Sequence, residues 1–359
     1  MTQTSLPAWA SDTVNRKNRL LEPAIDATKL PPVPRARTEF LARPLVAGIM
    51  DQGPAAVAGD CSFSEIPVSN PIVTFPEAKF YLFGMGGRRK MLYHAGVLRD
   101  ALSGELIRQW DVAREKIDWR TYSVLIETAA GESIAIVEDG EGVWLAEGGD
   151  RQVLAMEPVT LPDFSAKRYG DLLGPLLHEV LINIVPAGPV PNIFVYRKPW
   201  YRDAAMMCMV LRRTGNLHLV RDWILSLRRP FDQNNGRHQE PDNLGELLYM
   251  ISLVADRSHP LVSVVLKEVE RFRSGRHLCG LTDGGKQAVY QTKWLKLGLR
   301  SLGLEDDFEI PQAAESYSSL FWMDFRDQHV PVPPFRDEGR WRYPYLAHAD
   351  HESQIGRAH

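Results

Sequence analysis

The polar side chains that could carry out chemistry gather at the starts of predicted helices in the second half of the chain. The segment "PWYRDAAMM" places two aromatic rings and an Arg-Asp pair directly before an apolar run. Such rings stack on the apolar faces of sugars, while carboxylates and guanidinium groups form charge-assisted hydrogen bonds to hydroxyls. We therefore predict a binding site for a sugar-like ligand. Its candidate binding residues are Trp200, Tyr201, Arg202, Asp203, Asn235, Tyr290, Lys293, Trp294 and Tyr317.

Carboxyl groups in the same helix-start segments are the candidates for catalysis. Hydrolysis of a glycosidic bond needs two of them, about 6.5–9.5 Å apart for inversion and about 5–5.5 Å apart for retention. Glu240 or Asp242 is our candidate for the general acid, and Glu315 for the partner base. Structural roles compete with these assignments, since Asp242 suits an N-cap and Glu315 suits a position near a helix dipole. Glu246, one turn after Asp242, is a further alternative.

We predict neither a cofactor nor a bound metal. The segment "HADHE" contains metal-ligand residue types at suitable spacing, namely His348, Asp350, His351 and Glu352. It lies close to the last residues of the sequence, where fraying is common. The pair His178–Glu179 in "LLHEVLIN" lacks the second His of a metalloprotease helix, so we expect His178 to be packed against its neighbours. The glycine-rich "GMGGRRK" lacks the strand–loop–helix context and the Lys-Ser/Thr ending of a phosphate loop.

The elements that must position these residues change in type along the chain. Residues 1–76 are rich in Pro and Ala, which predicts an extended or irregular segment. Residues 77–160 alternate apolar and polar side chains around turns such as Asp139–Gly140, which predicts a small antiparallel β unit. Residues 165–355 show helical periodicity. The predicted helices cover approximately 168–183, 200–213, 216–228, 242–256, 259–274, 287–302, 313–326 and 343–353.

One of these helices differs from its neighbours. The run "AAMMCMVL" is apolar on every side, which predicts a helix buried all round, whereas 216–228 and 242–256 carry a single apolar stripe. Fully buried helices that alternate with amphipathic ones favour two layers, an inner ring wrapped by an outer one.

The segment "PWYRDAAMM" resembles the W-x-R-D-A segment of glucoamylase-like glycosidases, members of the six-hairpin toroid superfamily. The match spans residues 199–216. It implies an α/α toroid for the helical region. Together with the β unit predicted at 77–160, this gives the expected fold class, a mainly α fold with a small β part, in which the toroid is preceded by an N-terminal antiparallel β unit. A complete six-hairpin ring needs more helices than the sequence predicts, so we expect an incomplete barrel, one completed by the N-terminal segment, or one built differently.

The same resemblance assigns roles to two residues. By it, Arg202 and Asp203 hold hydroxyl groups of the terminal sugar and are not catalytic. It also implies inverting hydrolysis, in which one carboxylic acid donates a proton and one carboxylate activates water. No segment matches the catalytic-acid context of these enzymes, so no catalytic residue is carried over.

We therefore expect a glycosidase-like hydrolase that acts on a carbohydrate or a sugar-like small molecule through two carboxyl groups. Two alternatives stay open because a fold does not fix chemistry. The first is a sugar epimerase or lyase on the same scaffold. The second is a biosynthetic-pathway protein whose pocket is repurposed for binding without hydrolysis.

Composition narrows the partners and the compartment. The 359 residues carry a formal charge of −3, which offers no basic face for nucleic acid. No apolar run is long enough for a membrane span or signal peptide, and three widely spaced cysteines form no disulfide framework. We expect a cytoplasmic protein with a small-molecule or oligosaccharide ligand, without nucleic-acid or membrane partners. A homodimer is an open alternative, because an incomplete ring exposes apolar faces.

Overall fold

The computed structural model describes residues 78–167, 169–313 and 315, and the chain divides into two compact units. Within the described residues, the first unit holds 78–197 and 213–219, and the second holds 198–212, 220–313 and 315. The segment 1–76, "HADHE" and the helices predicted at 313–326 and 343–353 lie outside the described residues, apart from positions 313 and 315.

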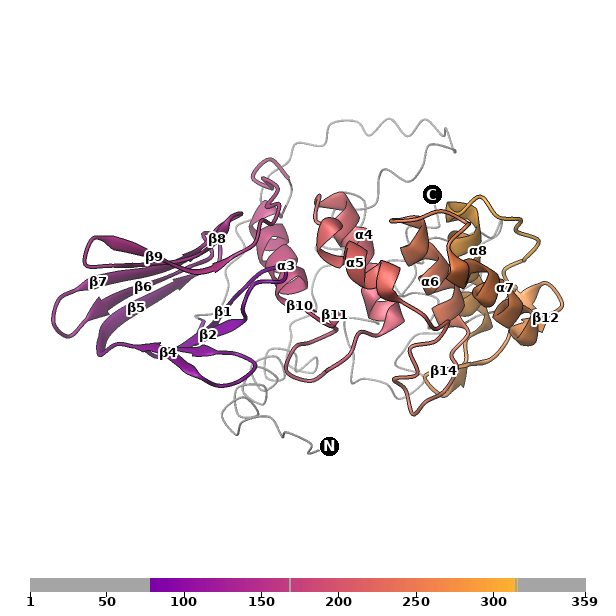
Figure 1. Ribbon diagram of the computed structural model, residues 1–359, viewed down its shortest axis with the longest axis horizontal. Coiled ribbons are helices and arrows are strands. Elements are labelled where there is room, and N and C mark those ends of the chain that lie inside the picture. The colour runs from indigo at the N-terminus through magenta and orange to yellow at the C-terminus, as the bar shows by residue number, and fades with distance from the viewer. Residues whose placement is uncertain (1–77, 168, 314, 316–359) are drawn as a thin grey trace, which may run out of the picture. The chain divides into compact units, whose positions relative to one another are not determined.

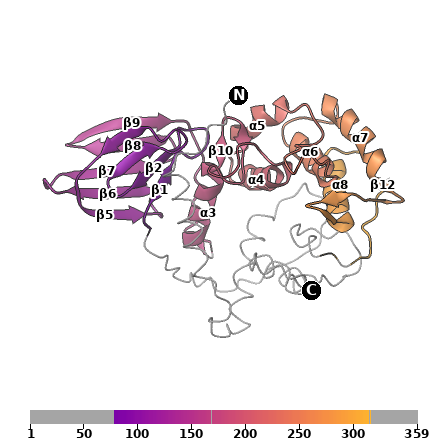
Figure 2. The ribbon, with the colours of Figure 1, turned by 90° about the horizontal axis from the view of Figure 1, so that it is seen from below.

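Two antiparallel sheets build most of the first unit (Figures 1 and 2). Strands follow one another in chain order within each sheet, so consecutive strands form hairpins. The four-stranded sheet consists of β1 (Tyr81–Phe83), β2 (Met91–His94), β3 (Val97–Asp100) and β4 (Leu106–Gln109). The five-stranded sheet consists of β5 (Val112–Asp118), β6 (Ser123–Thr128), β7 (Ser133–Glu138), β8 (Gly142–Glu147) and β9 (Asp150–Met156).

The two sheets share one hydrophobic core. The period-two pattern of β6 buries Val124 and Ile126 and exposes Leu125, and β7 repeats the alternation with Ile134 and Ile136. These side chains cluster with apolar residues of the four-stranded sheet. The predicted strands of this region are confirmed. The buried members of the core are Tyr81, Phe83, Met91, Tyr93, Leu98, Val124, Ile126, Ile134, Ile136, Val143 and Leu145.

The predicted fold class, a mainly α toroid with a small β part, is wrong. Among the described residues there are two antiparallel sheets with nine strands in all, and six helices. Of these residues, 31% are helical and 25% lie in strands. The physical reason is the shared core of the two sheets, which makes the strand region a packed unit of its own instead of an appendage to a helical ring.

Helix α3 (Gly170–Ile182) belongs to this first unit, although the sequence-based boundaries placed it with the later helices. The amide of Gly86 donates to the carbonyl of Leu181 at 3.0 Å. His178 stacks on Tyr81 and Tyr122, with ring centroids 5.1 and 5.5 Å apart. This position agrees with the packed His expected for this segment. The short hairpin of β10 (Ile184–Val185) and β11 (Gly188–Pro189) follows α3.

A buried carboxylate organises the glycine-rich loop between β1 and β2. The amides of Gly84 and Met85 donate to the Glu138 carboxylate at 3.1 and 2.6 Å, and the Arg88 guanidinium donates to it at 2.9 Å. The amide of Gly87 donates to Glu157. Internal carboxylates thus occupy the amides that a phosphate would need, which agrees with the prediction that this loop is not a phosphate loop.

The buried Lys90 side chain binds backbone carbonyls of the same loop, and its titration should change the free energy of unfolding with pH. Its ammonium donates to the carbonyls of Gly84 and Gly86, and burial lowers its pKa to about 7, against the attraction of Glu138 and Glu157. Between pH 7 and the usual lysine pKa of about 10.4, the unfolded chain binds more protons than the folded one, so this group makes stability rise with pH.

We predict that Lys90→Met abolishes this contribution. Urea denaturation at pH 7, 8, 9 and 10 measures the free energy of unfolding of both proteins. The wild type should become more stable relative to the variant as pH rises. Parallel pH profiles for the two proteins would contradict the assignment.

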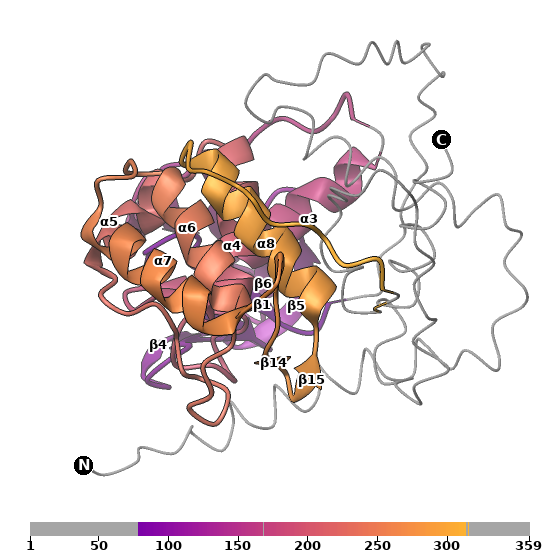
Figure 3. The same cartoon turned by 90° about the vertical axis from the view of Figure 1, so that its right-hand side faces the viewer.

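Helices dominate the second unit (Figure 3). The six predicted helices that fall on described residues are all present, with ends that differ from the predicted ones by a few residues. Two short hairpins lie between α7 and α8, formed by β12 (Arg273–Ser274) with β13 (His277–Leu278) and by β14 (Leu281–Thr282) with β15 (Gly285–Lys286). The helices after α3 are α4 (Tyr201–Arg213), α5 (His218–Ser226), α6 (Asp242–Ser252), α7 (Pro260–Phe272) and α8 (Ala288–Ser301).

Helices α6 and α8 make the most extensive helix contact among the described elements, and they lie side by side in Figures 1 and 3. Two glycines allow the backbones to touch. A Cβ atom added to Gly245 would collide with backbone atoms of Trp294 and Leu295. One added to Gly298 would lie 2.6 Å from the carbonyl oxygen of Gly245. This close contact brings the first turns of both helices to the same end of the pair.

Gly245→Ala should therefore destabilise the second unit by about 3 kcal/mol, at the upper end of the cost of overpacking, because backbone cannot move aside as a side chain can. Gly174→Ala in α3 is the matched control, since its new Cβ would meet only the Tyr122 hydroxyl, at 3.0 Å. Urea denaturation of the full chain measures both. Equal effects of the two substitutions would contradict the close contact.

Within the described residues, no helix is both long and apolar enough to cross a membrane.

Candidate functional site

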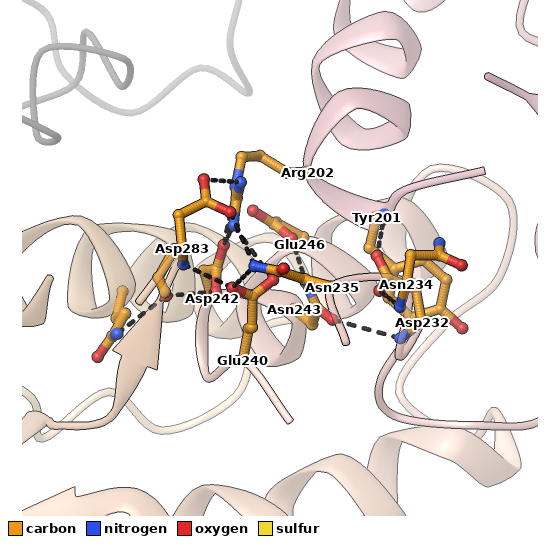
Figure 4. Close-up of polar contacts among 12 residues, drawn as sticks. Tyr201, Arg202, Asp232, Asn234, Asn235, Glu240, Asp242, Asn243, Glu246 and Asp283 are labelled. Carbon is orange, nitrogen blue, oxygen red and sulfur yellow. Dashed lines mark hydrogen bonds and ion pairs between the residues drawn. The ribbon is translucent and has the colours of Figure 1, made fainter. Parts of the chain in front are cut away.

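One guanidinium group in the second unit holds several carboxylates (Figure 4). Arg202 lies in the first turn of α4 and is only 8% exposed. Its Nε and Nη2 atoms donate to Oδ2 of Asp242 at 3.0 and 2.8 Å, and its Nη1 atom donates to Asp283 at 2.8 Å. Nη2 also reaches Glu240 at 3.5 Å. We call Arg202, Asn235, Glu240, Asp242 and Asp283 the Arg202 cluster.

Four different elements supply the members of this cluster. Arg202 comes from α4, Asp242 is the first residue of α6, and Asn235 and Glu240 come from the loop that precedes α6. Asp283 lies in the tight turn between β14 and β15, where its φ of 49° places it in the left-handed region that Asp tolerates. The cluster therefore depends on the packing of the whole helical unit and not on one local motif.

Asp242 is fully buried and has both carboxylate oxygens occupied. Oδ2 accepts from two nitrogens of Arg202, and Oδ1 accepts from the Thr282 hydroxyl at 2.7 Å. Gln291 of α8 donates in turn to the Thr282 hydroxyl at 2.9 Å. The side chain of Asp242 makes these contacts instead of capping α6, whose N-cap residue is Pro241. Asp242 is thus best suited to orienting the guanidinium of Arg202.

Glu240 has a different environment. It is 3% exposed, and its Oε1 accepts from the amide of Asp283 at 2.6 Å and from Asn235 at 3.1 Å. Burial raises the pKa of Glu240, and the neighbouring Asp242 carboxylate raises it further, against the opposing effects of these hydrogen bonds and of Arg202. A carboxyl group in such a setting can keep a proton and release it to a reacting atom.

Two further carboxyl groups border the cluster. Asp232 accepts from the amide of Tyr201 at 2.8 Å and from the amide of Asn234 at 2.9 Å. Asp203 follows Arg202 in α4. Burial raises the pKa of both carboxyl groups, and the charge of Arg202 counteracts this. Asp203 thus lies beside the cluster, and its predicted role in binding a ligand stays a prediction.

Glu246 lies one turn into α6 and is completely buried. Asn243 donates to its Oε2 at 3.1 Å. Burial raises the pKa of Glu246 well above its usual range, and the Asp242 charge adds to that effect. In Figure 4 the carboxyl group of Glu246 lies near the Arg202 side chain, whose charge counteracts the rise in pKa.

The remaining predicted binding residues lie in two groups. Tyr290, Lys293 and Trp294 are completely buried in α8, and Trp294 lies against Tyr249 of α6 with ring centroids 6.1 Å apart. Trp200 is half-buried before α4. The buried Tyr201 donates its hydroxyl to the carbonyl of Arg229 at 2.9 Å. Tyr317 lies outside the described residues.

Glu315 caps helix α8. Its two carboxylate oxygens accept from the amides of Val289 and Tyr290 at 2.7 and 2.8 Å. These are first-turn amides that have no partner within the helix, and a carboxylate at this end also interacts favourably with the helix dipole. The contacts favour the structural role that competed with catalysis by Glu315.

Sequence reasoning missed Asp283 and Thr282. Both lie in "LTDGGK", which is typical of a tight turn and gives no catalytic signal. The only available sign was the proximity of this turn in sequence to the start of α8, where candidate residues were already expected.

Comparisons with known proteins add no relatives, since no family model, curated protein or solved structure matches this chain. Among the described residues, no group of His, Cys, Asp or Glu side chains has an arrangement that could hold a metal ion.

The coupling energies between Arg202 and two of its carboxylate partners, Asp242 and Asp283, should differ sharply. Asp242 is buried with Arg202, whereas the Asp283 side chain is 35% exposed. Double-mutant cycles with Arg202→Met should give a coupling energy of about 3 kcal/mol for Asp242→Asn, because the low dielectric of the interior strengthens that pair. The cycle with Asp283→Asn should give about 1 kcal/mol or less, because solvent screens it. Similar couplings from the two cycles, measured by urea denaturation, would contradict this ranking.

Proposed function

We propose that the second unit is a glycosidase-like hydrolase that binds a carbohydrate or a similar polyhydroxylated molecule at the Arg202 cluster. The observation that carries the proposal is the convergence of three carboxyl groups, from Glu240, Asp242 and Asp283, on a single guanidinium. Such a set offers several charge-assisted hydrogen-bonding groups to hydroxyls in a small space. The resemblance of the segment that contains Arg202 to glucoamylase-like glycosidases supports the same class of substrate.

In this proposal, Glu240 is the proton donor. Its raised pKa favours the protonated carboxyl group, which passes its proton to the leaving oxygen as the glycosidic C–O bond breaks. A second carboxylate attacks the anomeric carbon as that bond breaks. Water then hydrolyses the resulting glycosyl-enzyme bond, and Glu240 accepts the proton of that water. We assign this role to Asp283, the most exposed carboxylate that contacts Arg202. One nitrogen of Asn235 lies 3.1 Å from Oε1 of Glu240 and 3.0 Å from Oδ1 of Asp283, so these two oxygens are within about 6 Å of each other. That spacing favours retention over the inversion expected from the sequence.

Arg202 and Asp242 act as a holding pair. The ion pair fixes the guanidinium, and both oxygens of Asp242 are already engaged. The pair thus orients hydroxyls of the ligand without exchanging protons. We also place the enzyme in the cytoplasm, a proposal that the free thiols of Cys208 and Cys279 support.

Glu240→Gln should lower the rate of reducing-sugar release at least about 100-fold, as expected for loss of a general acid, while the melting temperature stays close to that of the wild type. Activity of the wild type should decline as pH rises through the raised pKa of Glu240, because the proton donor is then lost. The assay uses a panel of aryl glycosides and oligosaccharides.

Glu305→Gln is the matched control, since Glu305 is an exposed glutamate of the same unit. It should keep full activity. Conversion of free sugars without any change in reducing ends, or full activity of Glu240→Gln, would contradict the hydrolase proposal.

A further inference from the structure

Glu246 has an oxygen whose surroundings the proposed hydrolysis does not explain. The residue is 0% exposed, and within the described part of the chain its Oε1 atom has no hydrogen-bond partner. Its other oxygen accepts from Asn243 at 3.1 Å. A buried polar atom left without a partner costs roughly 1–3 kcal/mol, so such an atom in a folded protein calls for an explanation.

Burial favours the protonated form of the Glu246 carboxyl group. Burial is the main reason that its pKa is raised, and the Asp242 and Asp232 charges add to it, while Arg202 and Asn243 oppose it. The buried Tyr290 phenol of α8 interacts with the same carboxyl group. Because Oε2 accepts from Asn243, Oε1 is the oxygen available to a proton or to a donor group of a ligand.

The charges around this position favour a cation. Even with Glu240 and Glu246 protonated, the other four carboxyl groups of the site outnumber the two buried cations, Arg202 and Lys293, among the described residues. A positively charged ligand would offset this excess and would allow Glu246 to ionise in a buried position. A carboxylate or phosphate ligand would add to the repulsion. The carboxyl groups concerned are Asp203, Asp232, Glu240, Asp242, Glu246 and Asp283.

We propose that the ligand of this site carries a protonated amine, as an amino sugar does, and that its ammonium group donates to Oε1 of Glu246. The inference deepens the proposed function, because it assumes that a sugar-like molecule binds at the Arg202 cluster. Asp283 and Asn235 are the members of the cluster with most access to solvent, so the ligand enters on their side. Glu246 is then the residue that selects amine-bearing ligands over neutral ones.

Binding should exchange the proton of Glu246 for the ligand cation. At neutral pH the amine arrives protonated, and the carboxyl group releases its proton to the buffer as the ion pair forms. Binding of an amino sugar therefore releases close to one proton, whereas binding of the parent neutral sugar releases none.

Isothermal titration calorimetry of the full chain tests the proposal with glucosamine, galactosamine, their N-acetyl forms, the parent sugars and glucuronate. Each titration is run at pH 7 in two buffers with different ionisation enthalpies, which gives the number of protons released. We expect the free amines to bind at least about tenfold more tightly than the N-acetyl and parent forms, a difference of about 1.4 kcal/mol. We expect glucuronate to bind most weakly.

Two variants make the result specific. Glu246→Gln preserves the shape of the side chain but cannot ionise, so it should remove both the amine preference and the proton release. Glu305→Gln should leave both unchanged. Equal affinity for amine and neutral sugars, absence of amine binding, or an unchanged preference in Glu246→Gln would overturn the inference.

The test of the amine site can be told apart from the test of the hydrolase proposal. Glu240→Gln should lose turnover and still prefer the amine. If Glu240→Gln kept full turnover while the preference depended on Glu246, the hydrolase proposal would fail and the amine site would stand. If turnover depended on Glu240 but neutral sugars bound as tightly as amines, the reverse would hold.

Discussion

The backbone contact between α6 and α8 is the constraint on which the rest of the helical unit depends. Gly245 and Gly298 leave no room for even one additional carbon atom at the contact. Close approach of this kind fixes the rotation of each helix, since only the glycine faces can meet. The carboxyl groups at the start of α6 are consequently held beside the first turns of α8, where Gln291 supports Thr282 and Glu315 caps the helix.

The electrostatics of the site follow from this packing. Taking carboxyl groups out of water is costly, and the structure compensates the cost unevenly. Asp242 receives two hydrogen bonds from Arg202 and one from Thr282, while Glu240 receives weaker support from Arg202 and Glu246 receives a single amide hydrogen bond. The result is a graded set of carboxyl groups: Asp242 in an anchoring ion pair, Glu240 with a raised pKa, and Glu246 with a pKa raised well above its usual range.

Helix and strand positions could be predicted from the sequence because they depend on local periodicity. The stripe of 216–228 and the alternation around Val124 each follow from side chains that are neighbours in the chain. The fold class could not be predicted. Whether alternating strands form a minor hairpin or two sheets with a common core depends on contacts between residues far apart in the chain, such as those that place Phe83 and Ile136 in one core.

The candidate site shows the same limit. Arg202, Glu240 and Asp242 could be named because their segments are unusually rich in polar and aromatic groups. Asp283 could not, since it pairs with Arg202 across a separation of 81 residues from an ordinary turn. The capping contact of Glu315 likewise connects it to a helix that begins 27 positions earlier at Ala288 (315 − 288). Roles that depend on which atoms remain unsatisfied after folding, as for Glu246, require coordinates.

The central claim is that a sugar-like ligand binds at the Arg202 cluster, and a crystal structure soaked with a panel of sugars and amino sugars tests it most directly. The account predicts ligand density with heavy atoms about 3 Å from the guanidinium of Arg202 or from the carboxyl groups of its cluster, because direct hydrogen bonds require that distance. Ordered sugar found only at sites more than about 10 Å from Arg202, beyond the reach of any hydrogen bond, would contradict it.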